Sequence, residues 1–176
     1  MRKRIVTILL TLFALVGLLF AAYVYLRGTI ILPAGEVAAT AEDIYKVIAS
    51  YIRENHGNFP KSEDDLIHQN FLSKRKMENG YEYFIRTVSL DPNFNDKKHL
   101  SRLYRFGSLM LCYGAKVEDI EMIDGNLYDK SNKKQILLID GPYRRFLQRL
   151  YYEPISIKWY KLMLQEEQRA DVSESQ

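Results

Sequence analysis

The sequence predicts an α+β protein: an N-terminal transmembrane helix, an amphipathic helix packed on a small antiparallel sheet, and further helices at the C-terminus. Three observations support this fold class. Residues 5–26 form an uncharged apolar run, residues 36–55 repeat apolar side chains at helical spacing, and residues 81–139 consist of short apolar stretches separated by turn signals. Helical patterns followed by a block of strand patterns are typical of α+β folds.

The apolar run from Ile5 to Leu26 contains no charged residue and no proline. As a helix it is roughly 33 Å long, enough for a hydrocarbon core of about 30 Å. Basic residues at positions 2–4 precede it and Arg27 follows it, so the positive-inside rule predicts a cytoplasmic N-terminus and a periplasmic or extracellular domain. A cleaved signal peptide is the alternative, but its apolar region is usually only about 7–15 residues long. We therefore expect a single-pass anchor in the inner (cytoplasmic) membrane.

The predicted organisation is a cytoplasmic tip with its anchor at 1–27, a linker at 28–35, an exported domain at 36–169 and a disordered tail at 170–176. Residues 1–27 hold four of the 25 Lys and Arg residues and none of the 22 Asp and Glu residues. The rest of the chain is therefore nearly neutral. A neutral domain has no global electrostatic reason to bind nucleic acid, so we expect no such partner.

The exported part begins with an amphipathic helix, predicted over residues 36–55. Its apolar positions recur at spacings of three and four: Val37, Ala41, Ile44, Ile48 and Tyr51. Gly57 suits the left-handed position that ends a helix. Ser62 is a good N-cap for a short helix over 63–71, and Asp65 resembles the acidic member of a capping box.

An apolar helix, an amphipathic helix and the polar-Gly-x-aromatic-Pro turn within Tyr51–Pro60 occur in this order. This arrangement resembles the type II secretion pseudopilins and the wider type IV pilin-like group, over residues 1 to about 75. The resemblance implies a membrane-held subunit without enzyme activity, which packs through its N-terminal helix against other membrane or pilin-like subunits. It does not extend to the family's processing site, because Arg4 stands where a Gly is required and residues 5–26 contain no Glu.

The remainder predicts an antiparallel meander of about five strands, followed by helices. The strand candidates are 81–88, 106–113, 117–123, a return strand from Leu127 and 136–139, with a polar loop at 91–100. Asp124-Gly125 is the strongest hairpin signal. A helix is expected over 143–152, a break at Glu153-Pro154, and a last helix capped by Ser156, on which Trp159, Leu162 and Met163 share a face.

No motif predicts catalysis or a bound cofactor, so we expect a protein that is not an enzyme. Asp91, Asn93 and Asn95 match the first three ligand positions of a calcium-binding loop, but Asp96 occupies the position that needs Gly. A looser site for a hard cation at Asp91, Asn95 and Asp96 is the alternative. A turn-rich loop is the better interpretation, and we expect no metal site. The single Cys112 is flanked by apolar residues, which favours a buried free thiol.

The one candidate binding surface is basic and aromatic: Arg144, Arg145 and Arg149 with Tyr151 and Tyr152. It suits anionic lipid headgroups or an acidic partner surface, and the alternative is a solvated helix face. The functional expectation is a pilin-like structural or assembly subunit of a secretion or envelope system. The second hypothesis is a single-pass envelope protein whose external domain binds a ligand or partner, as in a sensor or immunity module.

Overall fold

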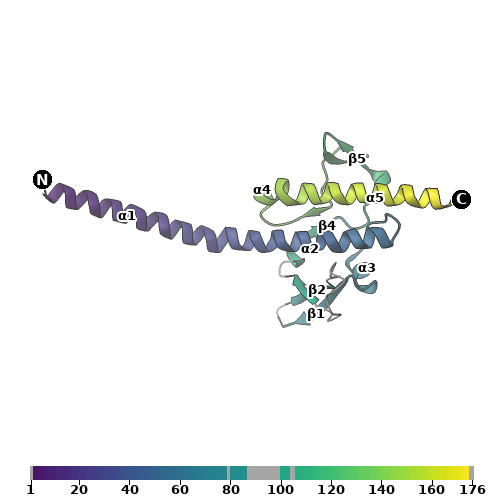
Figure 1. Cartoon of the computed structure of the whole chain (residues 1–176), viewed down its shortest axis with the longest axis horizontal. Helices are drawn as coiled ribbons and strands as arrows, with labels where there is room; N and C mark the ends of the chain where they lie inside the picture. Colours follow the sequence, from purple (N-terminus) through teal and green to yellow (C-terminus); the bar gives the residue numbers. More distant parts are fainter. Residues whose placement is uncertain (1, 79, 87–99, 104–105, 175–176) are drawn as a thin grey trace, which may run out of the picture. The chain divides into compact units, whose positions relative to one another are not determined.

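The computed structural model describes residues 2–78, 80–86, 100–103 and 106–174. The fold is α+β, with a long apolar N-terminal helix, small antiparallel sheets and C-terminal helices, as the sequence predicted (Figure 1). The helical elements are α1 (Arg2–Leu26), η1 (Arg27–Ile31), α2 (Leu32–Glu54), α3 (Glu63–His68), η2 (Phe106–Ser108), η3 (Val117–Asp119), α4 (Arg144–Leu147), η4 (Gln148–Tyr152) and α5 (Glu153–Glu174). The strands are β1 (Leu72–Met77), β2 (Gly80–Arg86), β3 (Leu100–Leu103), β4 (Met110–Leu111), β5 (Ile120–Ile123), β6 (Asn126–Asp129) and β7 (Ile139–Asp140). The chain divides into two units between Glu36 and Val37.

The first unit is helical. By length and composition, its apolar helix can cross a membrane, a property that signal sequences share. The linker expected at 28–35 is also helical, because η1 is a π-helical turn and α2 begins at Leu32. The Leu32 N–H donates to the Arg27 carbonyl oxygen, and the Thr29 hydroxyl donates to the Tyr25 carbonyl oxygen at 2.7 Å. Because η1 runs directly into α2, Pro33 lies inside a continuous helix, and its missing N–H leaves one backbone hydrogen bond unmade there.

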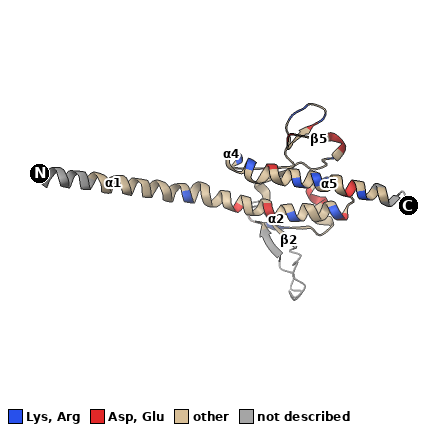
Figure 2. Ribbon diagram, turned by 45° about the horizontal axis from the view of Figure 1, so that its top comes forward, with Lys and Arg blue, Asp and Glu red and all other residues tan. Residues whose placement is uncertain are grey.

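The core of the second unit is built around α2 and α5. The predicted apolar stripe of α2 is confirmed, and its buried residues are Val37, Ala38, Thr40, Ala41, Ile44, Val47, Ile48, Ala49, Tyr51 and Ile52. Figures 1 and 2 show α2 with α5 on one side and the β1–β2–β3 sheet on the other. Trp159 of α5 is fully buried, and its ring packs against those of Tyr45 and Phe59. The helix α5 therefore packs on α2, which we expected to pack only on a sheet.

The turn after α2 follows the sequence prediction closely. Gly57 is left-handed, with φ of +85°. A Cβ atom at this position would lie 2.9 Å from the Met163 carbonyl oxygen, so the glycine lets the turn approach the backbone of α5. Ser62 caps α3 by accepting the Asp65 N–H at 3.2 Å. The helix ends at His68, earlier than predicted, because the chain turns into β1 at Leu72.

The strands form three small antiparallel sheets, β1-β2-β3, β4-β7 and β5-β6, rather than one meander of five strands. The prediction of a central strand over 106–113 is wrong, because η2 and the two-residue β4 occupy most of this stretch. Phe106 and Leu109 are buried while Met110 is exposed, which is the spacing of a turn and not of a strand. The strand at 136–139 is reduced to β7, and the basic segment 74–76 belongs to β1.

The predicted hairpin at Asp124-Gly125 is confirmed. It joins β5 to β6 in register, with Ile123 paired with Asn126. Both turn residues have positive φ, +48° at Asp124 and +77° at Gly125, as a two-residue type I′ turn requires. The loop expected at 91–100 lies mostly outside the described residues.

The C-terminal helices differ from the prediction at their junction. Glu153-Pro154 does not break the helix. The π-helical turn η4 runs directly into α5, and Pro154, which has no N–H, follows that turn. Ser156 lies inside α5 and does not cap it. The helix runs to Glu174, so most of the tail expected at 170–176 is helical, and residues 175–176 are outside the described part.

Candidate functional site

The candidate site lies on α4 and η4, the short helical segment before α5. Tyr143 begins it in a left-handed conformation, with φ of +57°, and its carbonyl oxygen accepts the N–H groups of Phe146 and Leu147. Leu147 and Tyr152 are buried and hold the segment on the core. The opposite face is exposed, and we name it the arginine surface: Arg144, Arg145, Phe146, Arg149 and Leu150.

The arginine surface combines charge with apolar side chains, and α4 appears in Figure 2 with blue Arg positions. Arg144 forms an ion pair with Asp140 at 3.1 Å and donates from Nε to the Gln148 side chain at 3.1 Å. Among the described residues, neither Arg145 nor Arg149 has an ion-pair partner. Two positive charges are therefore available to an anionic surface outside the protein.

Two tyrosines were expected on the same surface, and the structure corrects one of them. Tyr152 is fully buried, and its hydroxyl donates to the Pro142 carbonyl oxygen at 2.8 Å. The π-helical turn at η4 places this ring in the core, which a regular helical pattern does not indicate. Tyr151 is half-buried. The predicted arginines are all exposed, whereas the sequence analysis did not single out Phe146 and Leu150 as part of the surface.

Burial affects the ionisation of several tyrosines in unit 2. It raises the pKa of Tyr152 to about 12, and the nearby Asp140 carboxylate adds to this rise. The pKa values of Tyr51, Tyr83, Tyr113 and Tyr160 are also raised, mainly by burial. The folded state therefore holds these phenols in their neutral form.

We expect unit 2 to lose stability at alkaline pH. A raised pKa in the folded state stabilises the protein fully below the unfolded value of about 10, and this contribution is lost as pH rises toward 12 and above. Urea unfolding of the chain between pH 8 and pH 11.5 should show a falling free energy above pH 10. The Tyr152→Phe variant should show a shallower fall, and a flat profile in the parent protein would contradict the account.

A second candidate is a cleft of about 290 Å³ between the turn after α2, the loop at 114–118 and α5. Charged side chains around it include Lys61, Lys116, Glu118 and Glu167. The Gly114 N–H donates to the Pro60 carbonyl oxygen at 2.8 Å and ties the loop to the turn. Its walls combine these charged side chains with apolar ones such as Phe59 and Met163. The sequence did not predict this cleft, because three segments that are distant in the chain form it. The only local signals of it were two of its lining residues, Gly57 and Gly114.

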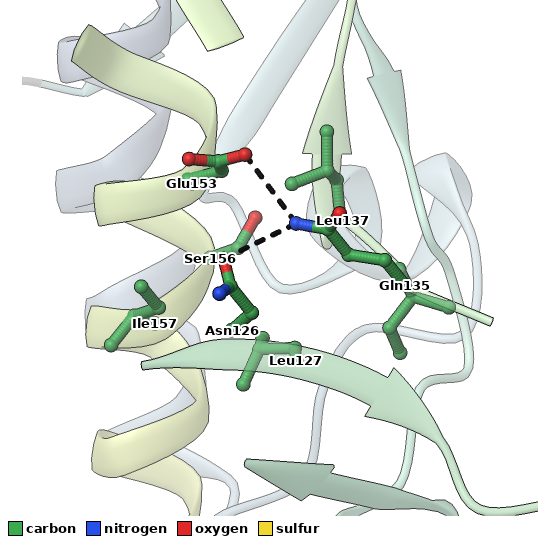
Figure 3. A pocket seen from close by; sticks show the side chains of 8 residues that line it. Asn126, Leu127, Gln135, Leu137, Glu153, Ser156 and Ile157 are labelled. Atoms are coloured by element: carbon green, nitrogen blue, oxygen red, sulfur yellow. Dashed lines mark hydrogen bonds between the residues drawn. The ribbon is translucent and has the colours of Figure 1, made fainter. Parts of the chain in front are cut away.

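A third hollow, shown in Figure 3, lies between β6, the segment before β7 and the start of α5. The Gln135 amide donates to Asn126 at 3.3 Å and to Glu153 at 3.4 Å across it. The hollow has no room for a water molecule. Ser156, on its wall, is buried, and its Oγ accepts the Leu138 N–H at 2.9 Å and the Ile139 N–H at 3.3 Å. This arrangement is a structural junction and not a binding site.

Replacing Ser156 by alanine should destabilise unit 2 by roughly 1–3 kcal/mol, because two buried N–H groups lose an acceptor. Chemical denaturation monitored by circular dichroism measures the effect. Lys161→Ala is a matched control, since Lys161 is exposed on the same helix, and its change should stay within about 0.5 kcal/mol. Equal stabilities of the two variants would contradict the role given to Ser156.

Two further sequence expectations concern reactive groups. Cys112 is exposed, so the prediction of a buried thiol is wrong. It follows the short β4 at the surface, although nearby protein atoms raise the pKa of its thiol by desolvation. The candidate calcium ligands Asp91, Asn95 and Asp96 lie outside the described residues. Within the described ranges, no group of three His, Cys, Asp or Glu side chains is placed to hold a metal.

A comparison with protein families gave no match, and comparisons with curated proteins and with solved structures gave none either. The function of this chain is therefore inferred from its residues and their geometry alone.

Proposed function

We propose that the protein is a membrane-anchored, non-catalytic subunit of pilin-like type, which serves a structural or assembly role in a secretion or envelope system. One observation carries the proposal: the apolar side chains of α1 from Leu12 to Leu26 are exposed. Examples are Phe13 at 78%, Leu18 at 69% and Phe20 at 67%. Such a surface is unfavourable in water by about 25 cal/mol for each Å². It needs lipid or neighbouring apolar helices as its environment.

The packing of unit 2 supports the pilin-like part of the proposal. An amphipathic helix, α2, follows the apolar helix and buries its stripe in an α+β core. The turn that carries the family resemblance is integrated in that core, since Phe59 is 3% exposed and packs on Trp159. In this proposal α1 lies in the inner membrane with its N-terminus in the cytoplasm, and unit 2 lies outside.

Site-directed cross-linking tests the assembly role. The native Cys112 is exposed, so it is first replaced by serine. Single cysteines are then placed along α1, for example Leu12→Cys, Leu15→Cys and Leu19→Cys, and the full chain is oxidised in its native membrane. A subunit that packs through α1 should form disulfide-linked dimers at positions that recur every three or four residues. Val172→Cys, on the exposed part of α5, is the control and should give no such pattern.

Absence of dimers, or of cross-links to other membrane helices, at every position in α1 would contradict the assembly role. It would favour the second candidate, an anchored binding module. The cleft of about 290 Å³ and the arginine surface are the observations that favour that candidate. A module of this kind should retain its partner when unit 2 is released from the anchor by a protease site inserted near residue 28, whereas an assembly subunit should lose it.

A further inference from the structure

The two long helices of unit 2 run in the same direction. Tyr45 of α2 lies beside Trp159 of α5, with ring centroids 6.3 Å apart and a hydrogen bond of 3.1 Å from the indole N–H to the Tyr45 carbonyl oxygen. Just past the C-terminal end of α2, Gly57 lies against Met163 and Glu167, which come later on α5 than Trp159. Residue numbers therefore rise together along the pair, as the ribbon in Figures 1 and 2 shows.

This parallel packing fixes the place of the arginine surface within unit 2. All α-helices rise by about 1.5 Å per residue. Going back from the Tyr45–Trp159 contact by the same number of residues on each helix leads to Glu153 on α5 and Ala39 on α2. Since α4 and η4 immediately precede Glu153, they lie at the end of unit 2 that carries Val37, its first residue.

The chain that enters unit 2 at this end is apolar. Residues 28–35 contain no charged side chain, and Ile31 and Leu32 are 55% and 54% exposed. If α1 lies in a bilayer, these residues belong to its interfacial region, only a few positions before Val37. The arginine surface is then at the same end of unit 2 as the residues by which the chain is tethered to the lipid.

The chemistry of the arginine surface matches such a place. Phe146 and Leu150 are 62% and 70% exposed, and they are four positions apart, as are Arg145 and Arg149. Apolar side chains beside unpaired arginines on one helical face are typical of segments that lie in the membrane interface. Arg stems cover apolar surface while the guanidinium remains at the headgroups. An acidic protein surface would satisfy the arginines but would not by itself require two large apolar side chains in water.

We propose that the arginine surface is a second membrane contact, which lies on anionic lipid headgroups of the bilayer that holds α1; this rests on the membrane anchoring proposed above. Phe146 and Leu150 insert at the boundary of headgroups and acyl chains, while Arg145 and Arg149 pair with lipid phosphates. Each arginine near an anionic surface changes the ratio of docked to undocked domain by roughly fivefold. The tether through residues 28–36 keeps the local concentration of lipid high, so a weak contact is sufficient.

The test uses the full chain with Cys112→Ser, reconstituted in nanodiscs of phosphatidylcholine alone or mixed with phosphatidylglycerol. An environment-sensitive fluorophore is attached to Leu150→Cys, and discs with spin-labelled lipid report contact by quenching. Val172→Cys, exposed near the far end of α5, is the matched control, and Leu18→Cys reports insertion of α1. The label at 150 should be quenched in anionic discs, the label at 172 should not, and Arg145→Gln with Arg149→Gln should lower the docked ratio about 25-fold.

The outcomes separate the two proposals. A quenched label at 18 with an unquenched label at 150 in both lipid mixtures would overturn the second contact and leave the anchor intact. A label at 150 that is shielded from water but unquenched would mean that protein covers the arginine surface, which also overturns the lipid contact. An unquenched label at 18 would overturn the anchor, and the second contact with it.

Discussion

Replacing Trp159 by alanine is expected to lower the free energy of unfolding of unit 2 by about 3–5 kcal/mol, the usual cost of truncating a buried large aromatic side chain. Trp159 of α5 is fully buried against α2, and these two helices form the centre of the core. Its ring stacks on Tyr45 at 6.3 Å and meets Phe59 edge-on at 5.6 Å. Its indole N–H donates to the Tyr45 carbonyl oxygen at 3.1 Å. The substitution therefore removes packing and leaves a carbonyl group with one partner fewer.

The measurement is urea unfolding followed by circular dichroism, because Trp159 is the only tryptophan and its loss removes the fluorescence signal. Trp159→Phe retains most of the ring contacts and loses the hydrogen bond, so its effect should be clearly smaller. Lys161→Ala, on the exposed face of α5, should change stability by less than about 0.5 kcal/mol. A Trp159→Ala variant as stable as this control would mean that α2 and α5 do not pack as described.

Placing two arginines in α1, as Leu15→Arg with Leu19→Arg, should remove most of the protein from the membrane fraction. Each arginine at the centre of a spanning helix disfavours insertion by about 2.5–3.5 kcal/mol. The two positions are 56% and 61% exposed, so neither charge finds a partner in the described part of the chain. The fraction that resists extraction at alkaline pH measures retention.

Leu15→Ala with Leu19→Ala is the control for this pair, because it shortens the same side chains without adding charge. Its retention should stay close to that of the parent protein. Unchanged retention of the arginine pair would contradict a role for α1 as the membrane span, and equal losses in both pairs would assign the effect to side-chain size and not to charge.

Local signals predicted the parts of the fold that depend on a few neighbouring residues. Asp124-Gly125 forms the expected hairpin, Gly57 the expected left-handed turn and Ser62 the expected cap. In each case the conformation depends on the backbone freedom of one residue or on one side-chain oxygen, and both can be read from the residue type. The apolar stripe of α2 also followed from its spacing.

Features that depend on long-range packing could not be predicted in the same way. The run at 106–113 is apolar enough for a strand, but its residues are divided between η2 and β4 by their contacts with the core. Ser156 was expected as a cap and instead accepts hydrogen bonds from residues near β7. The face of α5 that contains Trp159 was predicted, but its partner, α2, lies more than a hundred positions earlier in the chain.

The candidate site shows the same difference between features that depend on single residues and features that depend on packing. Arg145 and Arg149 were predicted to be exposed because charged residues on a helix face normally are. The burial of Tyr152 depends on the π-helical turn of η4, which places this residue on the same buried face as Leu147, five positions earlier. A sequence pattern read with the fixed period of an α-helix does not predict a π-helical turn.

The intact mass of the protein extracted from membranes tests the central claim most directly. We predict a mass that corresponds to all 176 residues, since an uncleaved α1 is the anchor. Loss of about 25–40 residues from the N-terminus, with unit 2 recovered in the soluble exported fraction, would show that the apolar helix is a removed signal sequence. That result would contradict the anchor, the assembly role through α1 and the second membrane contact together.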